Sequence, residues 1–144
     1  MISESIRFAP TATSLEIAAS HGGAFFRAKR HAEAVLVYDA ALRRAFNAQI
    51  ASFLAFVLAV SSDDSVRNPT LALEWAEKSQ QVDPNSVTTL NALAVALAAN
   101  GRFPEAVVIA ERALGAAVAT NEPLAVKVSE ARLEFFRSGR PWRE

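Results

Sequence analysis

Apolar residues recur along the chain at helical spacing, in short segments separated by polar residues, glycine or proline. The stretch NALAVALAANGRFPEAVVIAERAL, residues 91–114, shows this pattern, which stops at Asn100-Gly101 and resumes after Pro104. Apolar positions three and four residues apart lie on one face of a helix. No stretch shows the sustained alternation of apolar and polar residues that predicts a strand. The sequence therefore predicts an all-α fold.

Capping and turn residues divide the chain into seven predicted helices. Asn68-Pro69 combines an N-cap residue with a first-turn proline, and Ser86 is placed as an N-cap after a turn. Gly101 and Gly139 can adopt the left-handed conformation that ends a helix. We predict helices over residues 13–28, 31–45, 48–61, 69–82, 86–100, 103–118 and 122–138.

The longest irregular piece between these helices is SSDDSVRN, residues 61–68. Its polar and charged residues predict a solvated surface loop, and we expect it to be the most mobile internal segment. Paired acids without a glycine turn and a distal glutamate do not form a calcium loop.

Composition narrows the class of protein. The chain has 144 residues, of which 51% are hydrophobic and 21% charged, as in one folded domain rather than a disordered chain. Lys plus Arg and Asp plus Glu both number 15, so net charge gives no reason to expect nucleic acid or an anionic membrane as a partner. The longest apolar run, residues 50–60, is too short to span a bilayer. The chain has no cysteine, which fits a reducing cytoplasm. We expect a cytoplasmic protein, or a periplasmic one if the native chain is longer.

Few residues of the sequence are candidates for catalysis or metal binding. The sequence holds no nucleophile elbow, phosphate loop, zinc motif or dinucleotide fingerprint. His21 and His31 flank a predicted turn, but a metal site would need further ligands, so structural or surface roles are favoured. Ser61-Ser62-Asp63-Asp64 has no histidine nearby in sequence. We therefore predict no enzyme activity, no catalytic residue, no metal and no cofactor.

An internal repeat is present. In the first helix of each pair, a small residue is followed three positions later by a large apolar one: Gly22 and Phe25, Ala55 and Leu58, Ala94 and Leu97. The second helices carry matching residues at i, i+4 and i+7: Ala34, Tyr38 and Ala41; Ala72, Ala76 and Ser79; Ala106, Ala110 and Ala113. Ala72 and Ala106 are 34 residues apart. Small residues let paired helices approach closely, and stacked pairs share one core.

The pattern resembles the tetratricopeptide repeat, a helix–turn–helix unit of 34 residues. The third unit carries it most fully, through Leu90, Leu93-Ala94, Leu97, Gly101-Arg102-Phe103, Ala106, Ala110 and Ala113. The resemblance implies a right-handed superhelix of three helix pairs and a capping helix. The expected organisation is an N-terminal arm at 1–12, repeats at about 14–47, 48–85 and 86–119, a capping helix at 122–138 and a tail at 139–144.

The segments SVRNP (residues 65–69) and FFRSGRPWRE (residues 135–144), together with the alanine-rich third repeat, resemble the C-terminal portion of longer bacterial tetratricopeptide proteins, which often end in a similar arginine–glycine–arginine–proline–aromatic–arginine–glutamate tail. Two interpretations of Trp142 in this tail remain open. Its ring either folds back on the capping helix or extends as a contact for a partner.

Ligands of this family usually lie in a concave groove lined by the first helix of each pair, and the family's spacing assigns the inward-facing residues here. They are Phe26 and Arg27 in the first unit, Gln49, Ser52, Phe56 and Val60 in the second, and Thr88, Asn91 and Val95 in the third, with Glu16, Ala19, Gly23 and Ala99 beside them. Phe26, Phe56 and Val95 are expected to form an exposed apolar strip.

The resemblance implies a protein–protein interaction module without catalysis, which binds a peptide or helix in this groove. One alternative is a self-associating structural array, because no capping unit precedes the first helix. Another is an accessory segment of a larger enzyme such as a glycosyltransferase. The expected partner is a protein or peptide, with a homo-oligomer possible.

Overall fold

The computed structural model describes residues 12–144, and these residues form seven α-helices and no strand. The helices are α2 (Ala12–Arg27), α3 (His31–Arg44), α4 (Ala48–Val60), α5 (Pro69–Val82), α6 (Val87–Ala99), α7 (Phe103–Ala119) and α8 (Pro123–Arg137). Every observed end lies within one residue of the predicted end, so the all-α prediction is confirmed for this part of the chain. The predicted N-terminal arm, 1–12, lies outside the described residues except for Ala12, which begins α2.

Local hydrogen bonds explain why the helices begin and end where they do. The Asn68 side chain accepts a hydrogen bond from the Leu71 amide at 3.1 Å, and Ser86 accepts one from the Thr89 amide at 3.1 Å. These bonds satisfy first-turn amides that have no partner inside the helix. Gly101, with φ 76°, follows α6 in the left-handed conformation that the sequence predicted.

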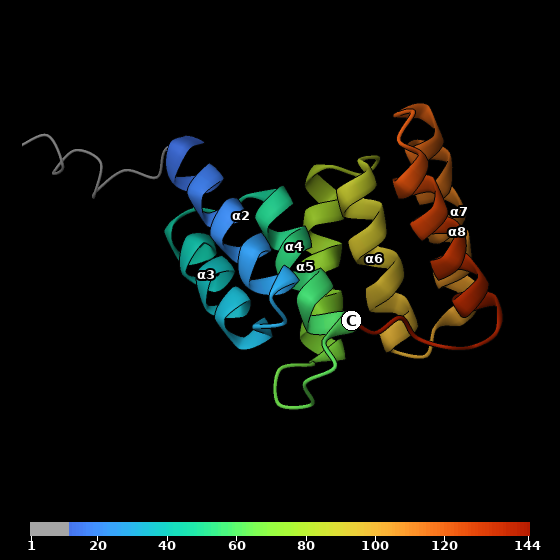
Figure 1. Cartoon of the computed structure of the whole chain (residues 1–144), viewed down its shortest axis with the longest axis horizontal. Coiled ribbons are helices and arrows are strands. Elements are labelled where there is room, and N and C mark those ends of the chain that lie inside the picture. Colours follow the sequence, from blue (N-terminus) through green and yellow to red (C-terminus); the bar gives the residue numbers. More distant parts are fainter. Residues whose placement is uncertain (1–11) are drawn as a thin grey trace, which may run out of the picture.

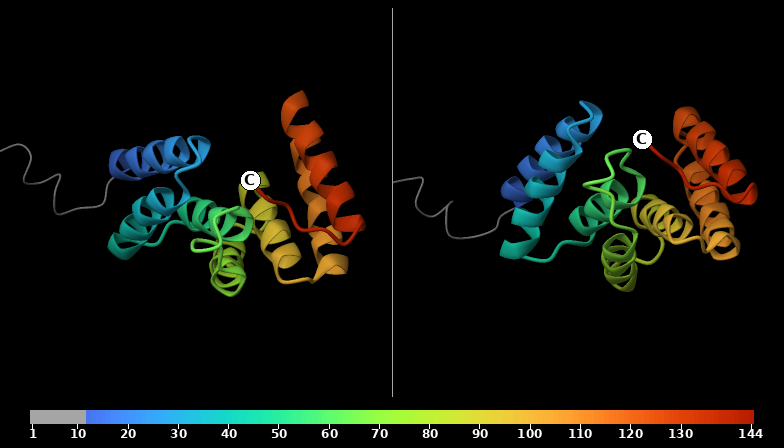
Figure 2. Two further views of the ribbon diagram at one scale, coloured as in Figure 1. Left: turned by 60° about the horizontal axis from the view of Figure 1, so that its bottom comes forward. Right: turned by 90° about the horizontal axis from the view of Figure 1, so that it is seen from below.

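The helix pairs lie side by side in chain order (Figure 1). α2 packs on α3, α4 on α5 and α6 on α7, while α4 also contacts α2 and α6, and α8 packs on α7. Figure 2 shows α2 and α8 at the two ends, with α4 and α6 between them. Because α4 and α6 have neighbours on several sides, most of their residues are buried, which accounts for their nearly continuous apolar sequences.

Small residues fill the helix contacts at the repeat positions. Ala55 and Ala94 in the first helices are 0% and 2% exposed, and Ala72 and Ala106 in the second helices are both fully buried. In the first pair, Gly22 takes this position beneath the ring of Tyr38. The backbones approach closely at these points, as the internal repeat predicted.

The C-terminal tail, residues 139–144, returns to the end of α4 (Figure 1). The Glu144 amide donates to the Val60 carbonyl at 2.7 Å, and the Ser62 amide donates to the Glu144 carbonyl at 3.0 Å. Arg143 Nη1 lies 3.4 Å from the Ala59 carbonyl. The tail therefore supplies donors to carbonyl groups that the last turn of α4 leaves without helical partners. Trp142 packs edge-on against Phe135 of α8, with ring centroids 5.0 Å apart, so the fold-back interpretation is confirmed.

The segment 61–68 between α4 and α5 makes hydrogen bonds within itself and to α4. Ser61 is fully buried, while Asp63 and Asp64 are exposed as expected. The Ser65 amide bonds to the Asp63 carboxylate at 2.9 Å, and the Asn68 amide bonds to the Leu58 carbonyl at 2.9 Å. The expectation that this is the most mobile internal segment stays a prediction, which amide hydrogen exchange tests.

None of the helices in the described range is long and apolar enough to cross a membrane.

Candidate functional site

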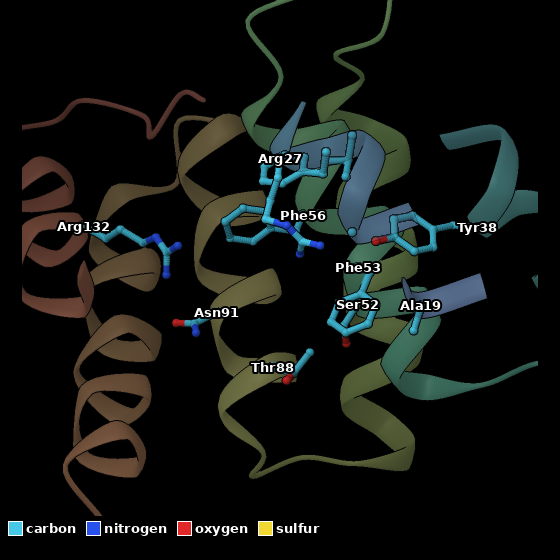
Figure 3. A pocket seen from close by; sticks show the side chains of 12 residues that line it. Ala19, Arg27, Tyr38, Ser52, Phe53, Phe56, Thr88, Asn91 and Arg132 are labelled. Carbon is cyan, nitrogen blue, oxygen red and sulfur yellow. The ribbon is translucent and has the colours of Figure 1, made fainter. Parts of the chain in front are cut away.

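A cavity of about 350 Å³ lies between α2, α4 and α6, with one residue of α8 at its edge (Figure 3). Its lining combines aromatic rings, small residues and a few polar groups, the mixture found in many ligand sites. The lining residues are Ala19, Gly23, Phe26 and Arg27 of α2, Tyr38 of α3, Ser52, Phe53, Phe56 and Val57 of α4, Thr88 and Asn91 of α6, and Arg132 of α8.

Most of the residues assigned to the groove from the sequence meet at this cavity. Those that line it are Phe26, Arg27, Ser52, Phe56, Thr88 and Asn91, together with Ala19 and Gly23. Gln49 is exposed on the first turn of α4 but does not line the cavity, and neither Glu16 nor Ala99 does. The first helices of the three pairs thus share one face, as the repeat spacing predicted.

Two of the predicted groove residues are in the core instead, so this part of the assignment was wrong. Val60 is 0% exposed and Val95 is 1% exposed. The tail covers the end of α4 that carries Val60, and Val95 lies on α6, which packs against α4, α5 and α7. The expected strip of three apolar residues is therefore reduced to Phe26 and Phe56, both partly exposed.

Phe26 and Phe56 form the aromatic part of the cavity wall. Their rings meet edge to face, with centroids 5.9 Å apart, a favourable arrangement of two aromatic quadrupoles. Phe26 also stacks on His31, with centroids 5.1 Å apart. Because neither ring is fully buried, the pair offers an apolar surface that a ligand side chain can cover.

Polar groups of two kinds face the same space. Asn91 and Thr88 are partly exposed and lie at the α6 side of the cavity (Figure 3). The Ser52 hydroxyl, in contrast, is buried and lies 2.9 Å from both the Ala48 carbonyl and the Ser79 hydroxyl, so its hydrogen-bonding capacity is used within the protein. Tyr38 points its ring toward the cavity, and burial raises its pKa to about 12, which keeps the phenol protonated at neutral pH.

Two guanidinium groups border the aromatic pair. Arg27 is exposed and lies above Gly23, where an added Cβ would be 3.2 Å from Arg27 Nη1. Arg132 reaches in from α8, and its Cζ lies 5.0 Å from the centroid of the Phe56 ring. The sequence reasoning missed Arg132, because only the packing of α8 and the return of the tail bring that position to the cavity.

His31 and Ser61 form a buried pair beside this site. His31 Nδ1 lies 2.6 Å from Ser61 Oγ, which also accepts a bond from the Asp63 amide at 3.1 Å. Burial lowers the pKa of His31, so the ring is neutral at neutral pH. Ser61 is 0% exposed and does not line the cavity. We interpret the pair as a structural joint between α3 and the end of α4, a structural role that the sequence favoured for His31.

Within the described range, no group of three histidine, aspartate or glutamate side chains is placed to hold a metal ion. Comparison with protein-family models, with curated proteins and with solved structures found no match to this chain.

Proposed function

We propose that this chain is a non-catalytic binding module that holds a peptide segment of another protein in the cavity between α2, α4 and α6. The observation that carries the proposal is the partly exposed pair Phe26 and Phe56, bordered by Arg27 and Asn91. An apolar surface with a polar rim is typical of the few residues that dominate binding energy at protein interfaces. A cavity of about 350 Å³ is large enough for one or two side chains.

The repeat supports the same proposal. Three helix pairs carry small residues at equivalent buried positions, and the cavity lies on the face formed by their first helices. This is the face at which tetratricopeptide proteins bind ligands, and we extend the resemblance to propose a right-handed superhelix with α8 as its cap. Stacked helix pairs hold such a face rigid, because each pair is fixed by its neighbours.

The test combines peptide selection with one substitution and a matched control. A random dodecapeptide display library is selected against the protein, and the strongest peptide is synthesised and measured by fluorescence anisotropy. Phe56→Ala should weaken its binding roughly 30-fold, equivalent to about 2 kcal/mol for an interface hot spot. Phe46→Ala removes a ring of the same size that is 46% exposed and outside the cavity, and it should leave affinity unchanged.

The stability of Phe56→Ala must be measured alongside its binding. Phe56 is partly buried and contacts Phe26 and Arg132, so we expect a loss of about 1–3 kcal/mol, below the 3–5 kcal/mol of a core phenylalanine. Binding is then compared at a temperature where both proteins are folded. A folded Phe56→Ala protein that binds as tightly as the original, or a library that yields no peptide, contradicts the proposal.

A specific observation also favours self-association as a second candidate. A smaller cavity of about 290 Å³ at the outer side of α2 and α3 is lined mostly by apolar residues, among them Ile17, which is 50% exposed, and also by Ser14, His21 and Arg44. This is the end of the array that has no neighbouring helix pair among the described residues. Sedimentation at increasing concentration tests it: Ile17→Ser should shift a monomer–dimer equilibrium toward monomer, and a monomer at every concentration rejects this candidate.

A further inference from the structure

Arg132 is in an unusual position for an arginine. Only 14% of its side chain is exposed, and its Nε atom is buried with no hydrogen-bond partner. Its guanidinium lies over two rings, with Cζ 5.0 Å from the Phe56 centroid and 5.5 Å from the Trp142 centroid. Among the described residues, its one carboxylate neighbour is Glu144, whose Oε2 atom lies at a long distance of 3.8 Å from Arg132 Nη2.

We propose that Arg132, positioned by the C-terminal tail, recognises an acidic side chain of a peptide bound in the cavity. The inference rests on the proposed binding function and adds to it the chemistry of the ligand and a residue from outside the three helix pairs.

The charges around the cavity support an acidic ligand. Among the described residues that line it are two arginines, Arg27 and Arg132, and neither an aspartate nor a glutamate. Glu144 does not line the cavity, and its Oε2 atom already accepts a hydrogen bond from the Trp142 indole at 2.9 Å. An adjoining cavity shares Asn91 and Arg132 and includes one carboxylate, Glu122, which is exposed.

A buried cation whose charge is only partly balanced by a neighbouring carboxylate favours an anionic partner. Burial lowers the pKa of the Arg132 guanidinium, and Glu144 offsets that effect only in part. A carboxylate entering from the cavity would supply charge-assisted hydrogen bonds to this largely buried side chain. The rings of Phe56 and Trp142 occupy space beside the planar guanidinium, so a carboxylate bound at its N–H edge can make two parallel bonds.

The tail determines where this group points. Backbone hydrogen bonds between Glu144 and the residues that end α4 fix the tail, and Trp142 lies between Phe135 of α8 and Arg132. Figure 3 shows the Arg132 side chain directed from α8 toward the cavity. Trp142 is therefore a positioning residue, and its loss should weaken recognition of the acid more than binding of the rest of the peptide.

The position of Arg132 relative to the aromatic pair defines the expected ligand. Phe26 and Phe56 line the cavity together with Arg27 and Arg132, and the Arg132 guanidinium lies over the Phe56 ring, so an apolar side chain on the rings places its sequence neighbours near a guanidinium. We expect ligands in which an acidic residue is adjacent to a large apolar residue, inside the peptide rather than at its end.

Three pentapeptides that differ in one group test the proposal. The first is acetyl-Ala-Leu-Glu-Leu-Ala-amide, the second has Gln in place of Glu, and the third is the Gln peptide with a free terminal carboxylate. Dissociation constants come from NMR titrations that follow backbone amides and the Arg132 Nε–H signal. We expect the Glu peptide to bind roughly tenfold tighter than either Gln peptide, as charged hydrogen bonds provide.

Substitutions test whether Arg132 and Trp142 produce the preference for the Glu peptide. Arg132→Gln should reduce the ratio of the Glu and Gln peptide affinities to about one, while Arg137→Gln, an exposed arginine on the same helix, should leave it unchanged. Trp142→Ala should lower the ratio without changing the affinity of the Gln peptide, and Trp142→Phe should restore it.

Each contrary result has a distinct meaning. Equal binding of the Glu and Gln amides, or a ratio that survives Arg132→Gln, overturns the inference but leaves the cavity as a peptide site. Preference for the free terminal carboxylate over the Glu side chain also overturns it. If none of the peptides shifts the amides of Phe56 and Asn91, the inference is rejected, and the display library then decides separately whether the cavity binds peptides at all.

Discussion

Two glycines in the middle of helices should respond in opposite ways to the same substitution. Gly22 in α2 and Gly115 in α7 both lie inside helices without a positive φ, so alanine should stabilise each by about 0.5–1 kcal/mol through helix propensity alone. At Gly115 nothing lies within 4 Å of an added Cβ, and the full gain is expected. At Gly22 the added methyl would overlap the Cε1 and Cζ atoms of Tyr38.

The magnitude at Gly22 follows from how little Tyr38 can move. Tyr38 is 3% exposed, and its ring contacts Phe53 with centroids 5.7 Å apart. Overpacking a site of this kind costs about 1–3 kcal/mol, which exceeds the propensity gain. We therefore expect Gly22→Ala to lower the free energy of unfolding by about 1–2 kcal/mol, while Gly115→Ala raises it.

Urea unfolding followed by circular dichroism at 222 nm measures both changes, and thermal unfolding gives a second reading of roughly 3–5 °C per kcal/mol for a domain of this size. Tyr38→Leu removes the atoms that an alanine at position 22 would meet. In that background Gly22→Ala should become neutral or stabilising. If Gly22→Ala stabilises the unmodified protein as much as Gly115→Ala does, the close contact between α2 and α3 is refuted.

Two further predictions concern the core and its response to pH. Ala94→Leu should cost on the order of 1–3 kcal/mol, because Ala94 is 2% exposed where α6 meets its neighbours; an unchanged melting temperature would refute the repeat register. Stability should fall below about pH 6.5, because the pKa of His31 is lowered in the folded state and the unfolded chain takes up its proton first. His31→Gln should remove this contribution, so urea unfolding at pH 7.5 and 5.5 should differ less for that variant; an equal difference in both proteins would assign the pH dependence elsewhere.

Local chemistry made the helices predictable from the sequence. Asn68 and Ser86 begin helices by hydrogen bonds to amides three residues away, and Gly101 ends one through its own φ angle. Such interactions involve neighbours in sequence, so the residues that make them are visible as a pattern. The small residues at repeat positions were predictable for a related reason, because each must lie where two helices cross and only a short side chain fits.

The candidate site was predictable in part. Repeat spacing correctly placed Phe26, Phe56 and Asn91 on one face, since that spacing determines the direction of side chains along each first helix. The spacing misassigned Val60 and Val95, because it predicts which face of a helix a residue lies on but not which other element covers that face. The same residue type is exposed or buried according to a neighbour that is distant in sequence.

Only the tertiary structure decided the contacts between residues that are far apart in the sequence. The tail meets the end of α4 through Glu144 and Val60, the ring of His31 meets Ser61, and Arg132 enters a cavity built by α2, α4 and α6. No local pattern marks these pairs, since each is formed only after the helices have stacked and the free carbonyl groups of α4 require donors. The sequence by itself determined the helices and the face they share, because both depend on periodicity and capping. The electrostatic character of the site depends on the return of the tail to the end of α4, beside Arg132, and packing alone determines that.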